Sequence, residues 1–429
     1  MHSPDSATGG KRPTAPGRKV LILGSGFGGV YVLRQVIKSL RRHEKPDITV
    51  VSDENFFLFS PLLQEVAAGA VEPRHIAYPI RKLASRRRFS FVQATVTGID
   101  LAARRVETDA GTLGYDILIL GLGVVTDMTG LKSPGENVLT LKTLRDARGV
   151  RNHIIGAFEQ ASIESDRLRR QALLTFVVSG GGYTGVQLVS DLSDLIHKYL
   201  TEYYSVIDPA EIKVMLVETR DRIVGGLHPK FYNYVIKHLD RMGVDVRVDS
   251  RVTDVWHDRV EINGTEVVPT RTLLWVSGVV ANPRIAELAA ETDDIGRVVV
   301  DDFLALPEFP EVYAVGDCAH YTDPASGKAV APRAHTAVRQ AKAVARNVIA
   351  DLRGTARKRY RYTDSAETIS LGESRAVLRL YRLRLYGFPA RLLWYLAYAS
   401  LVIGKQNRLR VMTDWVLSRL FGRDTTFIK

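Results

Sequence analysis

One stretch near the start of the chain has the residues needed to bind a phosphate group. VLILGSGFGGV is a short apolar run followed by glycines at the spacing GxGxxG, namely Gly24, Gly26 and Gly29. A strand that breaks into a helix in this way needs the first glycine for a tight turn. The second lets a pyrophosphate approach the backbone, and the third packs the helix on the strand. Because the amino end of such a helix attracts anions, we predict a dinucleotide site here.

The residues after this motif have the spacing of a βαβ unit. A helix is expected over 30–40, and a second apolar strand is expected over 48–51. Asp53 lies just past the end of that strand, where a carboxylate can accept hydrogen bonds from a ribose diol. Asp53 is therefore the expected ribose ligand of the first site.

The same combination of strand, glycines and helix occurs a second time. LLTFVVSGGGYTG carries Gly180, Gly182 and Gly185 at the same spacing, and an apolar-periodic helix is expected over 186–199. Two such units in one chain are far less expected by chance than one. The sequence therefore predicts a second dinucleotide site.

The strand after the second motif indicates which dinucleotide binds there. This strand, over 212–217, ends at Glu218, which is placed for a second ribose diol. A carboxylate there repels a 2′-phosphate, so NADH is expected. Arg220 and Arg222 lie nearby and leave NADPH open.

Four further positions are candidates for contact with a cofactor. Pro61 lies in an apolar stretch over 56–69 that suits either a loop over a planar cofactor or an ordinary loop over the core. Two more buried strands end in glycines, at Gly123 and Gly278. Asp317 follows a strand and precedes an Ala-rich helix, so it is either a helix cap or a ligand of a cofactor lying along the first sheet.

The composition limits the chemistry of the chain. With 429 residues and 45% hydrophobic content, it is long enough for two or three cores. Its single cysteine, Cys318, excludes intramolecular disulfide frameworks, CxxC redox pairs and cysteine-based metal clusters. No metal site is expected. Residues 1–18 are rich in Pro, Gly and Ser without an apolar core, so we expect a flexible tail and a cytoplasmic location.

The net charge of +12 is concentrated near the end of the chain. From Arg353 to Lys429 there are 16 Lys and Arg against 5 Asp and Glu, together with two of the four tryptophans. This pattern favours a membrane surface over nucleic acid. The apolar stretch 388–403 is too short to cross a bilayer, and a basic break is expected over 405–410 before an interfacial helix over 411–421.

That interfacial helix is expected to place Val411, Trp415 and Leu417 on one side with Leu420 and Phe421. Trp394 and Trp415 are expected at the level of the lipid headgroups. A helix tucked into the core is the alternative, although it leaves the positive charge unexplained.

Together these motifs resemble the two-dinucleotide flavoprotein reductases, and more closely the type II NADH dehydrogenases, which pass electrons from NADH through FAD to a membrane quinone. The resemblance covers nearly the whole chain, and its most specific parts are ENFFLFSPLLQEVAAG, GGGYTGVQ, LLWVSGV and VYAVGDCA. It implies that the first glycine motif holds the FAD pyrophosphate and that Asp317 binds the ribityl chain. The second motif and Glu218 would then hold NADH.

The chain departs from the family pattern at three places. Gln187 stands where a glutamate is usual, and it can orient a group but not easily relay a proton. The usual Ala-Gln step of the quinone pocket is Ala334-His335, and Arg339 replaces the first of two glutamines, which leaves Gln340. At the end of the second strand Ser52 replaces the usual acid, with Asp53 one place later.

His335, Gln187 and Gln340 are the candidate catalytic residues. Because the flavin carries the hydride chemistry, the protein must supply orientation and, for quinone reduction, protons. His335 is the candidate proton donor, and a solvent-facing histidine is the alternative. The lone cysteine excludes sulfide:quinone and disulfide reductases, but a reductase for a soluble acceptor such as a ferredoxin and a non-catalytic nucleotide sensor remain as alternatives.

We therefore expect an α/β protein with two Rossmann-like dinucleotide-binding domains and a C-terminal helical membrane-docking segment. The FAD-binding domain is expected over 19–143 and 281–385, the NADH-binding domain over 144–280, and the amphipathic segment over 386–429. The expected location is peripheral, on the cytoplasmic side of the cell membrane. The expected partners are a membrane quinone, an anionic lipid surface and a second copy of the chain, and not nucleic acid.

Overall fold

The computed structural model describes residues 17–83, 88–131, 135, 137–363 and 366–427. Nearly all of the expected tail over 1–18 therefore lies outside the described residues. The chain divides into two compact units. Unit 1 comprises residues 1–57, 79–124 and 281–362, and unit 2 comprises 58–78, 125–280 and 363–429. Unit 2 thus contains the second glycine motif, the C-terminal helices and three segments of the expected FAD-binding domain, namely 58–78, 125–143 and 363–385.

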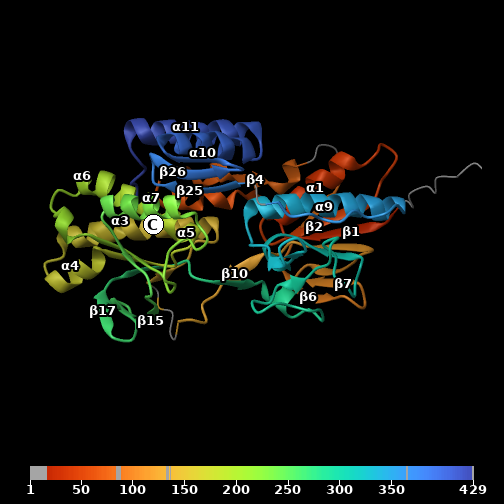
Figure 1. The fold of residues 1–429 in the computed structure, drawn as a ribbon, viewed down its shortest axis with the longest axis horizontal. Coiled ribbons are helices and arrows are strands. Elements are labelled where there is room, and N and C mark those ends of the chain that lie inside the picture. Colours follow the sequence, from red (N-terminus) through yellow and green to blue (C-terminus); the bar gives the residue numbers. More distant parts are fainter. Residues whose placement is uncertain (1–16, 84–87, 132–134, 136, 364–365, 428–429) are drawn as a thin grey trace, which may run out of the picture. The chain divides into compact units, whose positions relative to one another are not determined.

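Unit 1 is built on a parallel sheet of five strands in the order β21-β9-β1-β2-β5. The central strands are buried because their residues are almost all apolar, as in KVLIL and ILIL. Helices α1 and α9 pack against each other beside this sheet (Figure 1). The bounds are β1 Lys19–Leu23, β2 Asp47–Ser52, β5 Ser90–Gln93, β9 Ile117–Leu120, β21 Val312–Ala314, α1 Phe27–Ser39 and α9 Ala334–Arg353.

Smaller elements complete unit 1. An antiparallel meander is formed by β6 Val96–Asp100, β7 Arg105–Thr108 and β8 Gly111–Gly114. Two strand pairs and a short helix follow, namely β20 Val298–Val299 with β22 Ala319–His320, β23 Thr322–Asp323 with β24 Lys328–Ala329, and α8 Pro283–Ala286. Four further short strands lie at the unit boundaries: β3 Phe56–Leu58, β4 Ala77–Pro79, β10 Val124–Thr126 and β19 Val279–Ala281.

Unit 2 contains a second parallel sheet, in the order β11-β18-β12-β13-β14. Its strands are β11 Val138–Leu139, β12 Thr175–Ser179, β13 Lys213–Val217, β14 Val244–Arg247 and β18 Thr272–Trp275. A three-stranded antiparallel sheet is formed by β15 Val252–Val255, β16 Arg259–Ile262 and β17 Glu266–Pro269. The helices are α2 Leu63–Ala67, α3 Leu144–Ile163, α4 Arg167–Leu173, α5 Tyr183–Asp194, α6 Thr201–Tyr203 and α7 Pro229–Arg241, with a π-helical turn over Leu195–Leu200.

The end of the chain completes unit 2. The strands β25 Ala366–Leu371, β26 Arg375–Leu380 and β27 Leu383–Gly387 form an antiparallel sheet, and α10 Phe388–Leu401 packs on β26 and β27 (Figure 1). The last helix, α11 Lys405–Phe421, packs on α10. Among the described residues, no helix combines the length and apolar character needed to cross a membrane.

The structure confirms the α/β class with two Rossmann-like units, but it corrects several local expectations. The basic segment 405–410 is not a break, because it forms the first turns of α11. The actual break is at Val402 to Gly404, where Gly404 has a φ of +89°.

The expected positions of the two C-terminal tryptophans are also wrong. The Trp394 side chain is 0% exposed and stacks on Tyr398, with ring centroids 4.0 Å apart. Trp415 is buried as well, and its indole N–H donates to Glu65. Val411 and Trp415 face the core, whereas Leu417, Leu420 and Phe421 are exposed, so these five residues do not share one side of α11.

Candidate functional site

In unit 1 the first glycine motif connects β1 to α1. Gly24 has a φ of +97°, and a Cβ there would lie 2.3 Å from the Gly121 carbonyl oxygen. A Cβ on Gly29 would lie 2.0 Å from the Gly24 carbonyl oxygen, so only glycine lets the helix approach the strand this closely. A Cβ on Gly26 would meet nothing within 4 Å, which leaves open space at the start of the helix.

In unit 2 the second motif connects β12 to α5 with the same geometry. Gly180 has a φ of +115°, and a Cβ on Gly185 would lie 1.8 Å from the Gly180 carbonyl oxygen. Gly182 again faces open space. Neither α1 nor α5 has a side-chain cap at its amino end, so the first backbone N–H groups are available to an external acceptor. These features fit a bound pyrophosphate at each loop.

Glu218 lies beside the second glycine loop, as expected for a ribose ligand. It follows β13, and its Oε2 accepts a hydrogen bond of 2.7 Å from the Gly181 backbone N–H. Its Oε1 accepts one of 2.9 Å from the Arg220 backbone. The second nearby arginine, Arg222, stacks over Tyr232 at 4.4 Å. The carboxylate is half-buried and held in place, which suits a contact with a ribose diol.

Asp53 has a different environment from Glu218. It is exposed, and its Oδ1 accepts a hydrogen bond of 2.9 Å from the Glu54 backbone N–H. The residue before it, Ser52, is buried and hydrogen-bonds to Ser25 within the first glycine loop. The role of Asp53 in binding ribose therefore stays a prediction, and Ser52 is a second candidate.

Asp317 and Gln340 lie close together in unit 1. Asp317 is in a short helical turn, Gly316–Cys318, directly after β21. The Gln340 Oε1 accepts a hydrogen bond of 2.8 Å from the Gly316 backbone N–H, and the Gln340 side chain is buried. Gln340 thus holds the turn that carries Asp317. His335 lies five residues before Gln340 on the same helix, α9, and is half-buried.

The three remaining candidate positions are turns. Pro61 lies in the 3-10 turn Ser60–Leu62 of unit 2, and its carbonyl oxygen accepts a hydrogen bond of 2.9 Å from Gln64. Gly123 has a φ of +69° and faces open space in unit 1. Gly278 has a φ of +73° and lies against Asp127 in unit 2. Both glycines need a positive φ, which explains the residue type whether or not a cofactor binds there.

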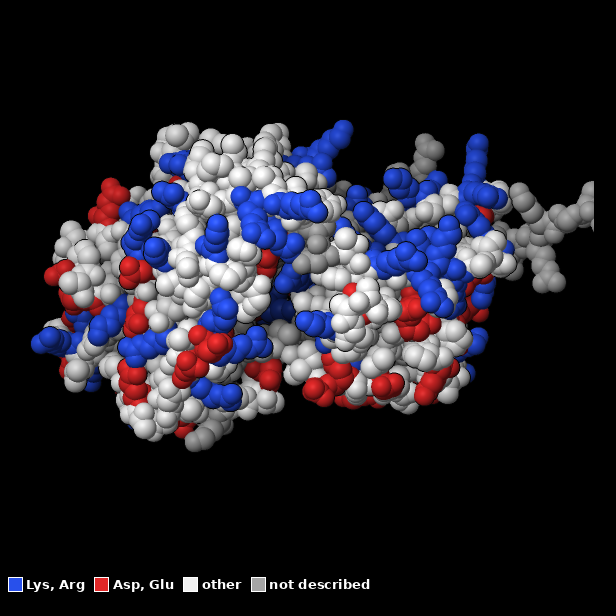
Figure 2. Space-filling model, viewed as in Figure 1, with Lys and Arg blue, Asp and Glu red and all other residues white. Residues whose placement is uncertain are grey.

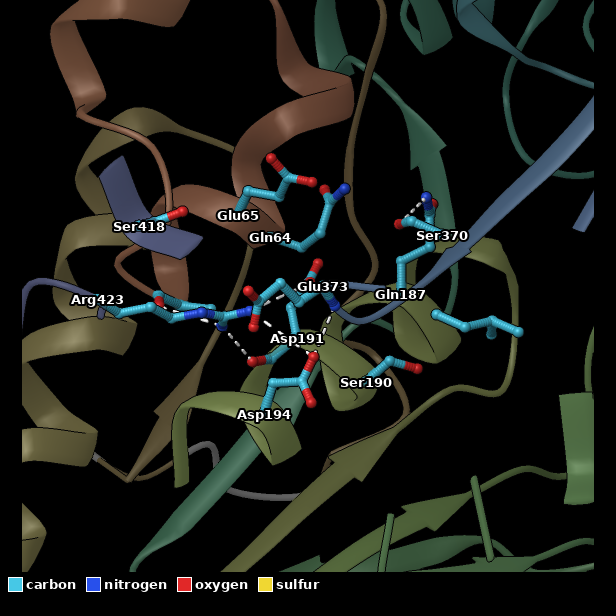
Figure 3. A network of polar contacts seen from close by, with 12 residues as sticks. Gln64, Glu65, Gln187, Ser190, Asp191, Asp194, Ser370, Glu373, Ser418 and Arg423 are labelled. Carbon is cyan, nitrogen blue, oxygen red and sulfur yellow. Dashed lines mark hydrogen bonds and ion pairs between the residues drawn. The ribbon is translucent and has the colours of Figure 1, made fainter. Parts of the chain in front are cut away.

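Gln187 connects the second glycine motif to the C-terminal sheet within unit 2. Its Nε2 donates a hydrogen bond of 2.9 Å to the Ser370 hydroxyl oxygen on β25 (Figure 3). Ser370 is fully buried. The Gln187 side chain is therefore fixed by a C-terminal residue. Its amide can orient a neighbouring group but cannot act as a proton donor in catalysis.

Sequence reasoning missed a buried network of charged residues one turn beyond Gln187 (Figure 3). Glu65 on α2 accepts hydrogen bonds of 2.7 Å from Arg391 and 2.5 Å from the Trp415 indole. Charged residues isolated in the apolar stretches 56–69 and 388–403 were the only signal of this contact. Two helices far apart in sequence are needed to bring those charges together.

Asp191 and Arg423 form the other half of this network. The Arg423 guanidinium lies 3.9 Å from Asp191 and 3.8 Å from Asp194, and it donates a hydrogen bond of 2.6 Å to the Asp191 carbonyl oxygen. Removal from water raises the pKa of the Asp191 carboxyl to about 7, and the nearby Glu65 charge adds to this effect. The network therefore ties the last residues of the chain to the helix of the second glycine motif.

Comparisons with known proteins agree with this architecture. Residues 18–341 match the family model described as pyridine nucleotide-disulphide oxidoreductase, and residues 369–424 match the model described as NDH2 C-terminal domain. The chain is 30% identical over 416 residues to a probable NADH dehydrogenase of Dictyostelium discoideum, which covers 95% of this chain and 90% of the relative.

Two further similarities are informative. The chain is 30% identical over 434 residues to the type II NADH:quinone oxidoreductase Ndh of Mycobacterium tuberculosis, which covers 96% of this chain and 91% of the relative. It also shares the fold of a solved structure of NDH2 from Plasmodium falciparum in complex with NADH. That match has a TM-score of 0.85 and 19% identity, and it covers 96% of this chain and all of that one.

Proposed function

Because the chain belongs to the type II NADH:quinone oxidoreductase family, we propose that it is a peripheral membrane flavoprotein that moves electrons from NADH through FAD to a membrane quinone without pumping protons. When bound, FAD supplies the redox chemistry, since it accepts a hydride from a nicotinamide and passes two electrons to a quinone. The observation that carries the proposal is the pair of glycine loops with equal geometry, one in each unit. The family favours this function over a soluble-acceptor reductase or a nucleotide sensor.

The residues of unit 1 are assigned to FAD. The backbone around Gly26 has the free space and the uncapped helix start that a pyrophosphate needs. Asp317 is assigned to the ribityl chain, and Gln340 holds the backbone of its turn through Gly316. Gln340 is thus a positioning residue in this proposal. Gly123 is assigned to the same site because a Cβ added at this position would meet no atom within 4 Å, which leaves space beside the turn.

The residues of unit 2 are assigned to NADH. Gly182 faces open space at the start of α5, as Gly26 does at the start of α1. Glu218 is placed to accept hydrogen bonds from the adenosine ribose and to repel a 2′-phosphate. Gly278 and Pro61 are retained as cofactor-contact candidates, with the support of turn geometry alone.

Reduction of a quinone consumes two protons, and His335 and Gln187 are assigned to this half of the reaction. His335 in the first turn of α9 is assigned as the proton donor, because imidazole is the side chain that most often acts as a general acid. Gln187 is held by Ser370 and can orient a carbonyl through its amide. A glutamine cannot supply the proton itself, which leaves that task to His335.

An exposed apolar surface on unit 2 supports membrane binding. Large apolar side chains are exposed on both C-terminal helices and on the β26–β27 hairpin, and in Figure 2 the surface over α10 and α11 carries little red. These side chains, which we call the apolar face, are Leu380, Tyr381, Leu383, Tyr386, Phe388, Leu392, Leu393, Leu396, Leu401, Leu409, Met412, Val416, Leu417, Leu420 and Phe421. So much exposed apolar area is unusual unless it binds lipid or protein.

The charge of the same segment favours anionic lipid. Between residues 375 and 421 there are nine Lys and Arg and one acidic residue, Asp414. The Asp414 Oδ2 lies 2.6 Å from the His75 Nδ1. Each basic side chain near an anionic leaflet adds about 1 kcal/mol to binding. Anionic lipid is most abundant on the cytoplasmic leaflet, so we propose that the protein binds the cytoplasmic side of the membrane.

We also propose that the protein forms a homodimer, and sedimentation of the purified protein would test this.

A stepwise spectroscopic experiment tests the function. The purified protein is expected to show the yellow absorbance of a flavin, to bleach with NADH and to regain its colour when a quinone is added. Bleaching without recolouring by quinones, together with recolouring by a ferredoxin, would favour the soluble-acceptor reductase. Absence of bleaching would favour the nucleotide sensor.

A further inference from the structure

The two glycine loops can be aligned residue by residue through their backbone hydrogen bonds. The Gly24 N–H donates to the Val51 carbonyl oxygen at 2.8 Å in unit 1, and the Gly180 N–H donates to the Val217 carbonyl oxygen at 2.8 Å in unit 2. The residue that follows each acceptor therefore occupies the same position relative to its loop. That residue is Ser52 in unit 1 and Glu218 in unit 2.

In unit 2 this position depends on a neighbouring glycine. A Cβ on Gly181 would lie 2.6 Å from the Ile223 Cγ2, 2.9 Å from the Glu218 Cβ and 3.0 Å from the Glu218 Oε2. Ile223 and Glu218 together thus fill the space that a side chain at 181 would need. Glu218 and Gly181 are compatible as a pair, whereas a larger residue at 181 would press on both neighbours, the carboxylate included.

In unit 1 both members of the pair differ. Ser25 stands at the position of Gly181, and Ser52 stands at the position of Glu218. The Ser52 hydroxyl donates a hydrogen bond of 2.8 Å to the Ser25 hydroxyl, which donates one of 3.1 Å to the Phe56 carbonyl oxygen. Both serines are buried. The first loop thus has a neutral hydroxyl pair where the second has a carboxylate.

We propose that the Ser25–Ser52 hydroxyl pair, and not Asp53, contacts the adenosine ribose of the dinucleotide in unit 1. This inference rests on the proposed binding of FAD there. The Ser52 oxygen has the register of Glu218 and faces the loop, whereas Asp53 comes one residue later and is exposed. The Asp53 Oδ1 accepts a hydrogen bond of 2.9 Å from the Glu54 backbone N–H, as a turn residue does, and a longer one of 3.3 Å from the Ser52 hydroxyl. The ribose of FAD is therefore bound through neutral hydrogen bonds.

The first test compares FAD affinity in three single variants. FAD is titrated into apoprotein and its dissociation constant is measured from flavin fluorescence. A neutral hydrogen bond contributes about 1 kcal/mol, so Ser52→Ala is expected to weaken FAD binding about fivefold. Asp53→Ala should change it less than twofold, as should the control Ser90→Ala, at an exposed residue of β5. A larger effect of Asp53→Ala, or no effect of Ser52→Ala, would overturn the inference.

The second test uses the coupling between the two positions. Ser52→Glu alone places a long side chain against the Cβ of Ser25 and is expected to weaken FAD binding more than tenfold. The double variant Ser25→Gly/Ser52→Glu recreates the pair found in unit 2 and should recover parental affinity or exceed it. Equal affinities of the single and double variants would contradict the proposal.

The outcome also separates this inference from the proposed function. If the parent binds no FAD in the titration, the proposed function fails. If the parent binds FAD and Ser52→Ala does so equally well, only the inference fails. Binding of NAD⁺ to unit 2 and the thermal midpoint of each apoprotein report whether a variant is still folded.

Discussion

The Arg391 guanidinium donates a hydrogen bond of 2.7 Å to the Glu65 carboxylate, although 326 residues separate them in sequence. The two side chains are 2% and 1% exposed. Arg391 also lies 4.2 Å above the rings of Trp394 and Tyr395. The C-terminal helices are therefore part of the core of unit 2, and they carry the apolar face on their other side. Removing them would leave Glu65 and Asp191 buried without their cationic partners.

Arg391→Met is accordingly expected to destabilise the protein strongly. Loss of one member of a buried ion pair typically costs about 3–5 kcal/mol because the other charge stays buried. The double variant Arg391→Met/Glu65→Leu should regain part of the loss, since no unpaired charge then remains at that pair. Thermal unfolding of the two variants checks this. The control Arg419→Met, on the exposed side of α11, should be close to the parent.

Asp191→Asn tests the pH dependence of the same network. Burial raises the pKa of Asp191 from 3.8 to about 7, so the folded protein holds a proton that the unfolded chain releases above about pH 4. The parent thus loses this contribution to stability as the pH rises from about 4 to about 7. Because Asn does not titrate, the variant should gain stability relative to the parent between pH 5 and pH 8.

Thermal midpoints of both proteins at pH 5 and pH 8 measure this change. Glu44→Gln is a control whose difference from the parent should be the same at pH 5 and pH 8, because hydrogen bonds from Arg353 lower the pKa of Glu44 to about 2. The stability that Glu44 contributes is present above its unfolded pKa and is lost as the pH falls toward 2. A difference between Asp191→Asn and the parent that is the same at both pH values would contradict the role given to Asp191.

The sequence predicted the parts of the fold that local pattern determines. Both glycine loops, their flanking strands and Glu218 lie where the spacing placed them, because a tight turn after a buried strand requires glycine at fixed positions. The register between strands was harder to predict from the sequence. The sequence pattern did not show whether Ser52 or Asp53 occupies the position of Glu218 at the end of β2. The backbone hydrogen bonds of the two loops align Ser52 with Glu218.

The C-terminal segment shows why the rest could not be predicted. Apolar and basic residues indicated membrane docking, but the pattern did not identify which aromatic residues face lipid. The Trp394 ring packs against Trp415 of the other C-terminal helix, with centroids 5.8 Å apart, and the Trp415 indole donates to Glu65 on α2. These partners lie on other elements, so periodicity within one helix cannot predict them.

Glu218 is expected to determine the choice of nucleotide. Its carboxylate lies beside the second glycine loop, where a 2′-phosphate would meet a like charge. Glu218→Gln removes that charge and should reduce the preference for NADH over NADPH by about tenfold in the rate of flavin reduction, which corresponds to about 1.4 kcal/mol. The exposed control Glu202→Gln should keep the parental preference. Faster flavin reduction by NADPH than by NADH in the parent would refute the assignment.

His335→Ala should separate the two half-reactions. If His335 donates a proton to the reduced acceptor, the variant should reduce quinone about 10²-fold more slowly while its flavin is still reduced by NADH at nearly the parental rate. Rapid-mixing absorbance measures each step. Unchanged rates of both steps in the variant would exclude this role.

The apolar face is the last feature to test, and point variants are preferable to truncation because the C-terminal helices belong to the core. Leu396, Leu420 and Phe421 are 55%, 69% and 78% exposed, and they lie on α10 and α11. Insertion of such a side chain into lipid contributes about 1.5–3 kcal/mol. Replacing all three by Ser should lower binding to anionic vesicles at least a hundredfold, with flavin reduction by NADH retained. Leu168→Ser, exposed on α4, is the matched control.

Binding of the parent should also weaken as salt rises from 0.1 to 0.5 M, because screening reduces the contribution of the basic side chains. Sedimentation with vesicles measures both effects, and full binding by the triple variant would show that another surface carries the membrane contact.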